Sequence, residues 1–465
     1  MKAKSIIFDL LALSLFWFCS VCQGGSNQSQ SDAVGIVLDI LKSDDQQMQS
    51  VAISMINEMK GEEVTKALAA ELPNLSVTSQ VQLLAALGNR GDAAALPAVV
   101  DTVKSGDESV RIAALNTLGQ LGDVSCIDLL AKTAANSSRQ ERKAARESLY
   151  QLRGSDIDKA ILKKIPKETD SKVKIELLDC IGERNILEGV DVLFETVKDS
   201  DRNVRVESLK VLRTVTGPDK LPVLIDLLIN AQSSSERNEA QKTLVAVAGK
   251  IEDVHARDNT ILAVLPTVKD IQARCSLLSV LGELGVESSL SVLTSSLNDE
   301  NEQVQAAAIR ALSNWPNPRP LNDLLKVAES SGNELHRTLA LRGFIHLLGL
   351  ENERSDQGTI LMYERAMNLA AGDTEKKKVL SALAQVKSLE ALEMSKMYLG
   401  NEKLSSEAEF AVIKIAENVY EQFPQQVKNT LNQLLKQLKN DSLRKQTEEL
   451  IHKIDNSGEQ QNEKS

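Results

Sequence analysis

Four histidines are the residues of this sequence best suited to acid–base chemistry or metal binding: His255, His336, His346 and His452. A zinc site on one helix needs a second His or Cys at a fixed helical spacing, and none of the four has one. His336 and His346 are also too far apart to form an i, i+4 pair. We therefore predict structural or surface roles for all four and no metal site.

Motifs for phosphate binding and nucleophilic catalysis are also missing from the sequence. No group of glycines has the spacing of a phosphate-binding loop, and no serine has the nucleophile pattern with flanking glycines. Carboxylate pairs such as Glu62 with Glu63 arise by composition in an acidic helical chain, so they do not indicate acid–base catalysis. We predict no catalytic residue and no cofactor.

Trp315 is the most distinctive single residue, because it lies in a WPNPRP turn where other parts of the chain have glycine. One interpretation makes it an exposed aromatic anchor, beside arginines, for a partner protein or an anionic ligand. The other interpretation, which we favour, makes it a filler beneath a proline-stiffened turn. The candidate partner-binding residues are Arg310, Trp315, Arg319, His336 and Arg342.

The segment that positions Trp315, residues 286–315, is the clearest copy of a repeated two-helix unit. Apolar residues recur every three or four positions in both halves, which is typical of helices with one apolar face. They are Val286, Leu290, Leu293 and Leu297 in the first half and Val304, Ala308, Ala311, Leu312 and Trp315 in the second. Asp299 and Glu302 have capping-box spacing, which predicts the start of the second helix.

Turn signals repeat along the chain at an interval that fits one helical hairpin. They are Gly88, Gly119, Gly154, Gly182, Gly217, Gly249, Gly282 or Gly285, Trp315 and Gly349. A glycine such as Gly88 suits the left-handed position that ends a helix. Further capping-box pairs are Ser138 with Glu141, Ser233 with Glu236, Ser331 with Glu334 and Ser406 with Glu409.

The repeated hairpins predict the fold class. No hairpin can bury its apolar face alone, so hairpins must stack on one another. No alternation of strand period is present. We predict an all-α fold, a right-handed α-solenoid (superhelix) of about a dozen antiparallel helical hairpins.

Residues 96–123 and 190–212 resemble HEAT repeats, of the short variety also found in phycobilin lyase subunits. In that family a turn Asp and an Arg at the start of the second helix form a ladder between neighbours. Asp199 and Arg205 match both positions, Arg111 matches only the second and Asp299 only the first. The resemblance covers roughly residues 33–400.

Residues 221–350 resemble more narrowly the HEAT regions of large exported bacterial proteins. Such regions can accompany a sugar-acting domain of the 3-keto-disaccharide hydrolase type. The sequence contains no such second domain, so the resemblance does not imply that activity.

The N-terminal residues 1–25 have a basic start, an apolar run and then small residues, which is typical of an export signal. Cleavage near Gly24 or Gly25 and lipidation of Cys22, as in a bacterial lipoprotein, are both open. Asp9 in the apolar run leaves a further alternative open, a cytosolic chain with a buried N-terminal helix. We expect an exported chain, periplasmic or extracellular. No later segment is long and apolar enough for a membrane span.

The remaining boundaries follow from composition and pattern. We expect a flexible linker over 26–32, the HEAT-repeat solenoid over 33–400, degenerate repeats and capping helices over 401–455, and a disordered tail over 456–465. Pro424 suits the first position of a helix. We predict that Cys126, Cys180 and Cys275 are unpaired core residues on apolar helical faces.

The charge of the chain restricts its partners. A net charge of −11 with only 3% aromatic residues argues against nucleic-acid binding. The basic runs at 163–174 and 376–378 are interpreted as solvated helix faces and ends.

We therefore favour a non-enzymatic, monomeric scaffold that binds a protein partner along an extended concave helical surface. The alternative is an enzyme or accessory subunit of a lyase-like or carbohydrate-active complex. His, Arg and Trp side chains lining one groove would favour that alternative.

Overall fold

The computed structural model describes residues 27–43, 45–351 and 354–462, and every regular element in these ranges is a helix. Twenty-six α-helices pair into thirteen consecutive antiparallel hairpins within the described ranges. The predicted all-α solenoid of about a dozen hairpins is therefore confirmed. The described hairpins group into two compact units, divided between Thr216 and Gly217.

The first unit contains six hairpins among its described residues. Their helices are α2 (Asn27–Lys42), α3 (Gln46–Glu58), α4 (Glu62–Ala70), α5 (Val77–Arg90), α6 (Leu96–Thr102), α7 (Glu108–Leu121), α8 (Cys126–Asn136), α9 (Arg139–Gln151), α10 (Ile157–Lys164), α11 (Ser171–Glu183), α12 (Val190–Thr196) and α13 (Arg202–Val215).

The second unit contains seven hairpins among its described residues. Their helices are α14 (Leu221–Ile229), α15 (Ser234–Gly249), α16 (Asn259–Val264), α17 (Ile271–Leu284), α18 (Leu290–Ser296), α19 (Glu302–Ser313), α20 (Leu321–Ser330), α21 (Glu334–Leu348), α22 (Asp356–Leu369), α23 (Asp373–Leu383), α24 (Leu389–Lys396), α25 (Ser405–Val419), α26 (Pro424–Leu435) and α27 (Asp441–Asn462).

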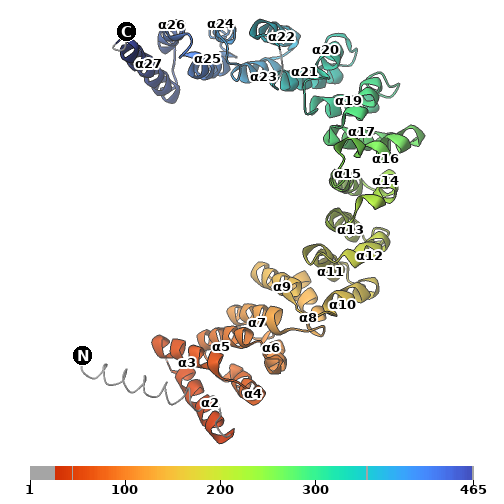
Figure 1. Cartoon of the computed structure of the whole chain (residues 1–465), viewed down its shortest axis with the longest axis vertical. Helices are drawn as coiled ribbons and strands as arrows, with labels where there is room; N and C mark the ends of the chain where they lie inside the picture. Colours follow the sequence, from red (N-terminus) through yellow and green to blue (C-terminus); the bar gives the residue numbers. More distant parts are fainter. Residues whose placement is uncertain (1–26, 44, 352–353, 463–465) are drawn as a thin grey trace. The chain divides into compact units, whose positions relative to one another are not determined.

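Each unit has two helical layers (Figure 1). The second helices of successive hairpins pack side by side, as α5, α7 and α9 do in the first unit and α15, α17, α19 and α21 in the second. The first helices form the other layer. Leu, Val, Ile and Ala dominate the buried residues between the layers, which suits closely stacked helices.

The prediction of left-handed helix ends at the recurring glycines is wrong for Gly88 and confirmed for Gly285, the alternative to Gly282. Gly88 lies inside α5 and Gly282 inside α17, whereas the left-handed helix ends are at Gly91 and Gly285, with φ of 67° and 60°. A Cβ added at Gly282 would lie 2.6 Å from the Cβ of Ala311 in α19. Glycine is therefore needed there because neighbouring second helices approach closely.

The start of α19 also differs from the prediction. Asn301, not Asp299, is the N-cap, because its Oδ1 accepts a hydrogen bond from the Gln303 N–H at 2.9 Å. Asp299 instead accepts a hydrogen bond from the Asn301 N–H at 2.9 Å and pairs with Arg274 of α17 at 2.5 Å. The turn Asp therefore links two hairpins rather than capping a helix.

Two of the other predicted caps are confirmed and two are wrong. Ser138 and Ser233 cap α9 and α15 through their side chains. Asn333 caps α21 in place of Ser331, and α25 begins before Ser406. In both wrong cases the pattern lies within two residues of the true helix start, so the hairpin assignment is unaffected.

The turn aspartates make the cross-hairpin ion pairs of the ladder that the HEAT resemblance implies, and Arg205 bonds to the turn carbonyl of its own hairpin. Asp199 pairs with Lys174 of the preceding hairpin at 2.7 Å, and Arg205 Nη1 donates to the carbonyl of Asp199 at 2.8 Å. Gln305 replaces the arginine and donates to the carbonyl of Asp299 at 2.5 Å. The same bond to the carbonyl six residues earlier is made by Arg111, Arg237, Arg337 and Arg444.

The two ends of the described chain are more helical than predicted. Helix α2 begins at Asn27, inside the expected linker, and α27 continues to Asn462, inside the expected tail. Pro424 opens α26, as predicted. The export signal over 1–25 and the lipidation of Cys22 lie outside the described residues. Among the helices that are described, none combines the length and apolarity of a membrane span.

Candidate functional site

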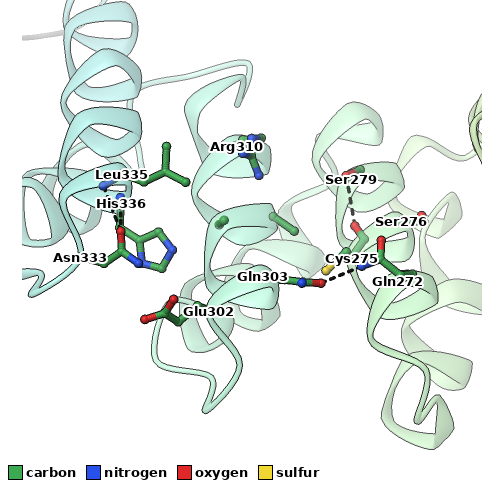
Figure 2. Close-up of a pocket in the computed structure, with 12 residues that line it drawn as sticks. Gln272, Cys275, Ser276, Ser279, Glu302, Gln303, Arg310, Asn333, Leu335 and His336 are labelled. Atoms are coloured by element: carbon green, nitrogen blue, oxygen red, sulfur yellow. Dashed lines mark hydrogen bonds between the residues drawn. The ribbon is translucent and has the colours of Figure 1, made fainter. Parts of the chain in front are cut away.

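A shallow groove of about 450 Å³ crosses three second helices of the second unit, α17, α19 and α21 (Figure 2). It contains two of the predicted partner-binding residues, Arg310 and His336. The residues that line it are Gln272, Cys275, Ser276, Ser279, Glu302, Gln303, Ala306, Ala307, Arg310, Asn333, Leu335 and His336.

The groove exists because equivalent positions of neighbouring helices carry small side chains. Ser276 and Ser279 on α17 face the same hollow as Ala306 and Ala307 on α19. Larger residues at these positions would fill the space between the helices. On one side the amides of Gln272 and Gln303 bond to each other at 2.7 Å, which fixes two hydrogen-bonding groups at the rim.

Opposite charges lie at the two ends of the groove (Figure 2). Glu302 begins α19 and Arg310 lies eight residues later, about 12 Å along the helix. Both side chains are exposed, and within the described part of the chain neither has an ion-pair partner. The groove therefore presents one negative and one positive group to whatever enters it.

His336 forms part of the groove wall although it is 98% buried. Its backbone N–H donates to the Oδ1 of Asn333, the N-cap of α21, at 3.3 Å. In the described structure the imidazole has no hydrogen-bond partner. Leu335, next to it, is 55% exposed and gives the groove an apolar contact point.

Trp315 is not an exposed anchor. Only 1% of its surface is accessible, and it is the largest of the fully buried side chains. Its indole N–H has no hydrogen-bond partner in the described structure. Trp315 is therefore a buried residue that fills space in the core, and it is not accessible to a partner.

Arg319 and Arg342 lie outside the groove. Arg319 forms an ion pair with Glu287 of the preceding hairpin. Arg342 Nη2 lies 2.7 Å from the Glu375 carboxylate of α23, which lowers the pKa of Glu375 through a hydrogen bond and through charge. The structure therefore brings together only Arg310 and His336 from the predicted set.

Comparison with protein-family models decides the family. A model of HEAT repeats matches residues 72–150, 159–245 and 259–344, which together are more than half of the chain. The chain is a HEAT-repeat protein. The matches lie inside the range of 33–400 expected from the resemblance, and the groove lies in the last match.

Solved HEAT-repeat structures share this fold at low identity. The crystal structure of Kap121p is 13% identical with a TM-score of 0.52, and the match covers 94% of this chain and 56% of that one. Kap121p bound to Nup53p gives 14% identity and a TM-score of 0.53, with coverage of 94% and 54%. A complex of Kap95p with RanGDP gives 10% identity and a TM-score of 0.51, and the match covers 91% of this chain and 66% of that one.

These likenesses concern the fold alone. The HEAT-repeat chain spans between about half and two thirds of the length of these structures. A search of curated proteins finds no match.

Sequence patterns indicate only a small part of the groove of this HEAT-repeat protein. Cys275, expected in the core, is partly exposed at the groove, whereas Cys126 and Cys180 are buried as predicted. Gln272 and Gln303 belong to no motif. The sequence indicates these two glutamines only by their separation of one repeat, which places polar residues at the same position of successive second helices.

The first unit has a charged cluster on its second helices that the sequence patterns did not indicate. Arg146 of α9 binds the buried carboxylate of Glu176 of α11 through two hydrogen bonds, at 2.5 and 2.6 Å. Beside it, Lys210 of α13 lies 2.7 Å from Glu207 and 3.8 Å from Asp179. The two carboxyl groups of α11 and α13 thus share one lysine.

Asp179 is the proton-holding member of this cluster. Burial, a hydrogen bond to Glu207 and the charge of Glu207 raise the pKa of Asp179 to about 8. The hydrogen bond to Asp179 and the pairing with Lys210 lower the pKa of Glu207. The hydrogen bond between Asp179 and Glu207 links α11 to α13. The described residues include no group of three His, Cys, Asp or Glu side chains that could hold a metal.

Replacing Asp179 with asparagine is expected to flatten the dependence of stability on pH. The pKa of Asp179 in the folded protein is above its value in the unfolded chain. Its contribution to the free energy of unfolding is therefore fully present below about pH 4 and is lost as pH rises through about 8. Asp179→Asn keeps a hydrogen-bond donor for Glu207 and removes the ionisation. In urea unfolding at pH 5, 7 and 9, the free energy of unfolding of the variant should increase relative to that of the wild type as pH rises. An unchanged difference between the two proteins at all three pH values would contradict the raised pKa of Asp179.

Proposed function

We propose that this HEAT-repeat protein is a protein-interaction scaffold, and that the groove across α17, α19 and α21 binds an extended polypeptide segment of a partner. The observation that carries the proposal is the groove itself. It is open and shallow, and it combines amides, two unpaired charges and one exposed leucine. Kap121p, which shares the fold, has been solved bound to another protein, Nup53p, and this agrees with such a use of the fold.

The groove chemistry fits a peptide better than a small molecule. Side-chain amides such as Gln272 and Gln303 can donate to and accept from the peptide groups of an extended chain. Glu302 and Arg310 would pair with side chains of opposite charge, and Leu335 would contact an apolar one. Small-molecule sites are usually deeper and more enclosed.

The alternative function, an enzyme or accessory subunit of a lyase-like or carbohydrate-active complex, has less support. His, Arg and Trp side chains on one groove would favour it, and the groove has His336 and Arg310 but also Ser and Ala, with Trp315 buried elsewhere. We therefore retain the scaffold as the proposed function.

Peptides selected from a random linear library against the purified chain test the proposal. We expect the triple variant Gln303→Ala, Arg310→Ala, Leu335→Ala to bind them at least about tenfold more weakly, because it removes three exposed contact groups worth about 1.4 kcal/mol or more together. The matched control is Ser291→Ala, Ser295→Ala, Asn298→Ala, two exposed positions in the first helix α18 and one in the turn that follows it. An equal loss of peptide affinity in both variants would contradict binding in the groove.

We further propose that the chain is exported through residues 1–25, with either cleavage near Gly24 or Gly25 or lipidation of Cys22. The support is the arrangement of basic, apolar and small residues in that segment. The intact mass of the chain from its native host separates the two outcomes, and a mass that includes all 25 residues would contradict export by this signal.

A further inference from the structure

A basic surface interrupts the acidic character of the chain in its first unit. Residues 139–174 contain eleven Lys and Arg against six Asp and Glu, whereas the whole chain has a net charge of −11. This segment includes α9, α10 and the start of α11. Such a reversal of charge within one chain indicates a local electrostatic function rather than a solubility requirement.

The cations at the centre of this segment lie along one edge of the hairpin stack. The turns that join first to second helices lie next to each other in successive hairpins. Lys164 at the end of α10 pairs with Asp128 of α8 at 2.6 Å, and Lys174 in α11 pairs with Asp199 of the following turn at 2.7 Å. We define the basic edge as four residues at these turns: Arg139, Lys163, Lys167 and Lys172.

The acidic residues of the same turns are already bonded within the protein. Glu141 pairs with Arg111 of α7. Glu168 accepts hydrogen bonds from the backbone N–H groups of Thr169 and Asp170, at 2.9 and 3.1 Å, and these bonds lower its pKa. The carboxylate of Asp170 itself caps α11.

The cations of the basic edge are not bonded in this way. All four side chains are exposed, and in the described ranges none has a carboxylate partner. The positive charge of the edge is therefore uncompensated, and it is available to an external anion.

We propose that the basic edge binds an acidic, extended segment of a partner protein. Charge complementarity favours an anionic partner. A nucleic acid fits less well, because Tyr150 is the only aromatic residue in 139–174 and the rest of the chain would repel a polyphosphate. The basic edge shares no residue with the groove of the second unit, so binding at one can be disproved without affecting the proposal for the other.

The geometry of the stack predicts a pattern of acidic residues. Neighbouring packed helices are separated by about 8–10 Å, and an extended chain advances about 3.3 Å per residue. Lys163, Lys167 and Lys172 belong to the hairpin of α10 and α11, and Arg139 belongs to the preceding hairpin. A segment with an acidic residue at every third position would therefore bring a carboxylate to each of these two hairpins.

Fluorescence anisotropy with a labelled peptide tests the proposal on the full chain. The probe has glutamate at every third position with glycine and serine between. The test variant is Lys163→Glu, Lys167→Glu, Lys172→Glu. The control is Lys269→Glu, Lys326→Glu, Lys387→Glu, which changes the net charge equally at three exposed lysines of the second unit. Matching circular dichroism and melting temperatures show that both variants fold.

We expect the wild type and the control to bind the peptide at low salt, about 50 mM, and the test variant to bind at least about tenfold more weakly. Equal weakening in the control would overturn the proposal, because it would show a response to net charge alone. Absence of binding by the wild type would also overturn it, as would binding of duplex DNA or of phosphatidylserine vesicles in preference to the peptide.

Discussion

Replacing Trp315 with alanine is expected to lower the free energy of unfolding by about 3–5 kcal/mol. The indole is 1% exposed and is the largest fully buried side chain in the described structure, so its removal leaves a cavity that the surrounding helices can fill only in part. The effect should be measured by urea unfolding. Hydrogen exchange should locate the destabilisation in α19, α20 and α21, because each repeat of a stack contacts only its neighbours.

Trp315→Phe is the control for this prediction. It keeps most of the apolar volume and removes an indole N–H that has no hydrogen-bond partner in the described structure, so it should cost much less than alanine. Selected peptides should still bind Trp315→Phe with wild-type affinity. A stable Trp315→Ala variant that has lost peptide binding would instead restore the anchor interpretation.

The second large effect is expected at the crossing of α17 and α19. Gly282→Ala would bring a Cβ to 2.6 Å from the Ala311 Cβ and 2.7 Å from its Cα. Because the contact is with backbone as well as side chain, the two helices must separate. We expect a net loss of about 1–3 kcal/mol in the free energy of unfolding, although alanine favours helices.

Gly249→Ala is the matched control, because Gly249 ends α15 and a Cβ there would meet no atom within 4 Å. We expect it to be neutral or to stabilise by up to about 1 kcal/mol. Urea unfolding of the two variants side by side measures the difference. If Gly282→Ala were as stable as Gly249→Ala, the close approach of α17 and α19 would not be what requires glycine.

The architecture could be predicted from the sequence because it depends on local and repeated signals. Apolar spacing in residues 286–315 predicts two helices, and the unburied face of such a hairpin requires a stack. The cap at Asn301 was missed because Asp299 offered the same chemistry two residues earlier. Gly282 and Gly285 were both left open as the turn glycine, because a glycine near a helix end suits a left-handed turn as well as a close helix crossing. The structure places the left-handed turn at Gly285 and the close crossing at Gly282.

The candidate site could be predicted only in part, because it depends on which residues of different hairpins become neighbours. Arg310 and His336 were chosen for their side-chain types and do lie together. Arg342 has the same chemistry, but α23 supplies it with Glu375 as a partner. Gln272 and Gln303 carry no motif, and their role follows only from the register between α17 and α19.

The most direct test of the scaffold account is photo-crosslinking from the groove to a selected peptide. A photoreactive amino acid in place of Leu335, which lines the groove and is 55% exposed, should crosslink to the peptide, and the same amino acid at Ser295, in the first-helix layer, should not. Crosslinks from both positions, or from Ser295 alone, would contradict binding in the groove across α17, α19 and α21.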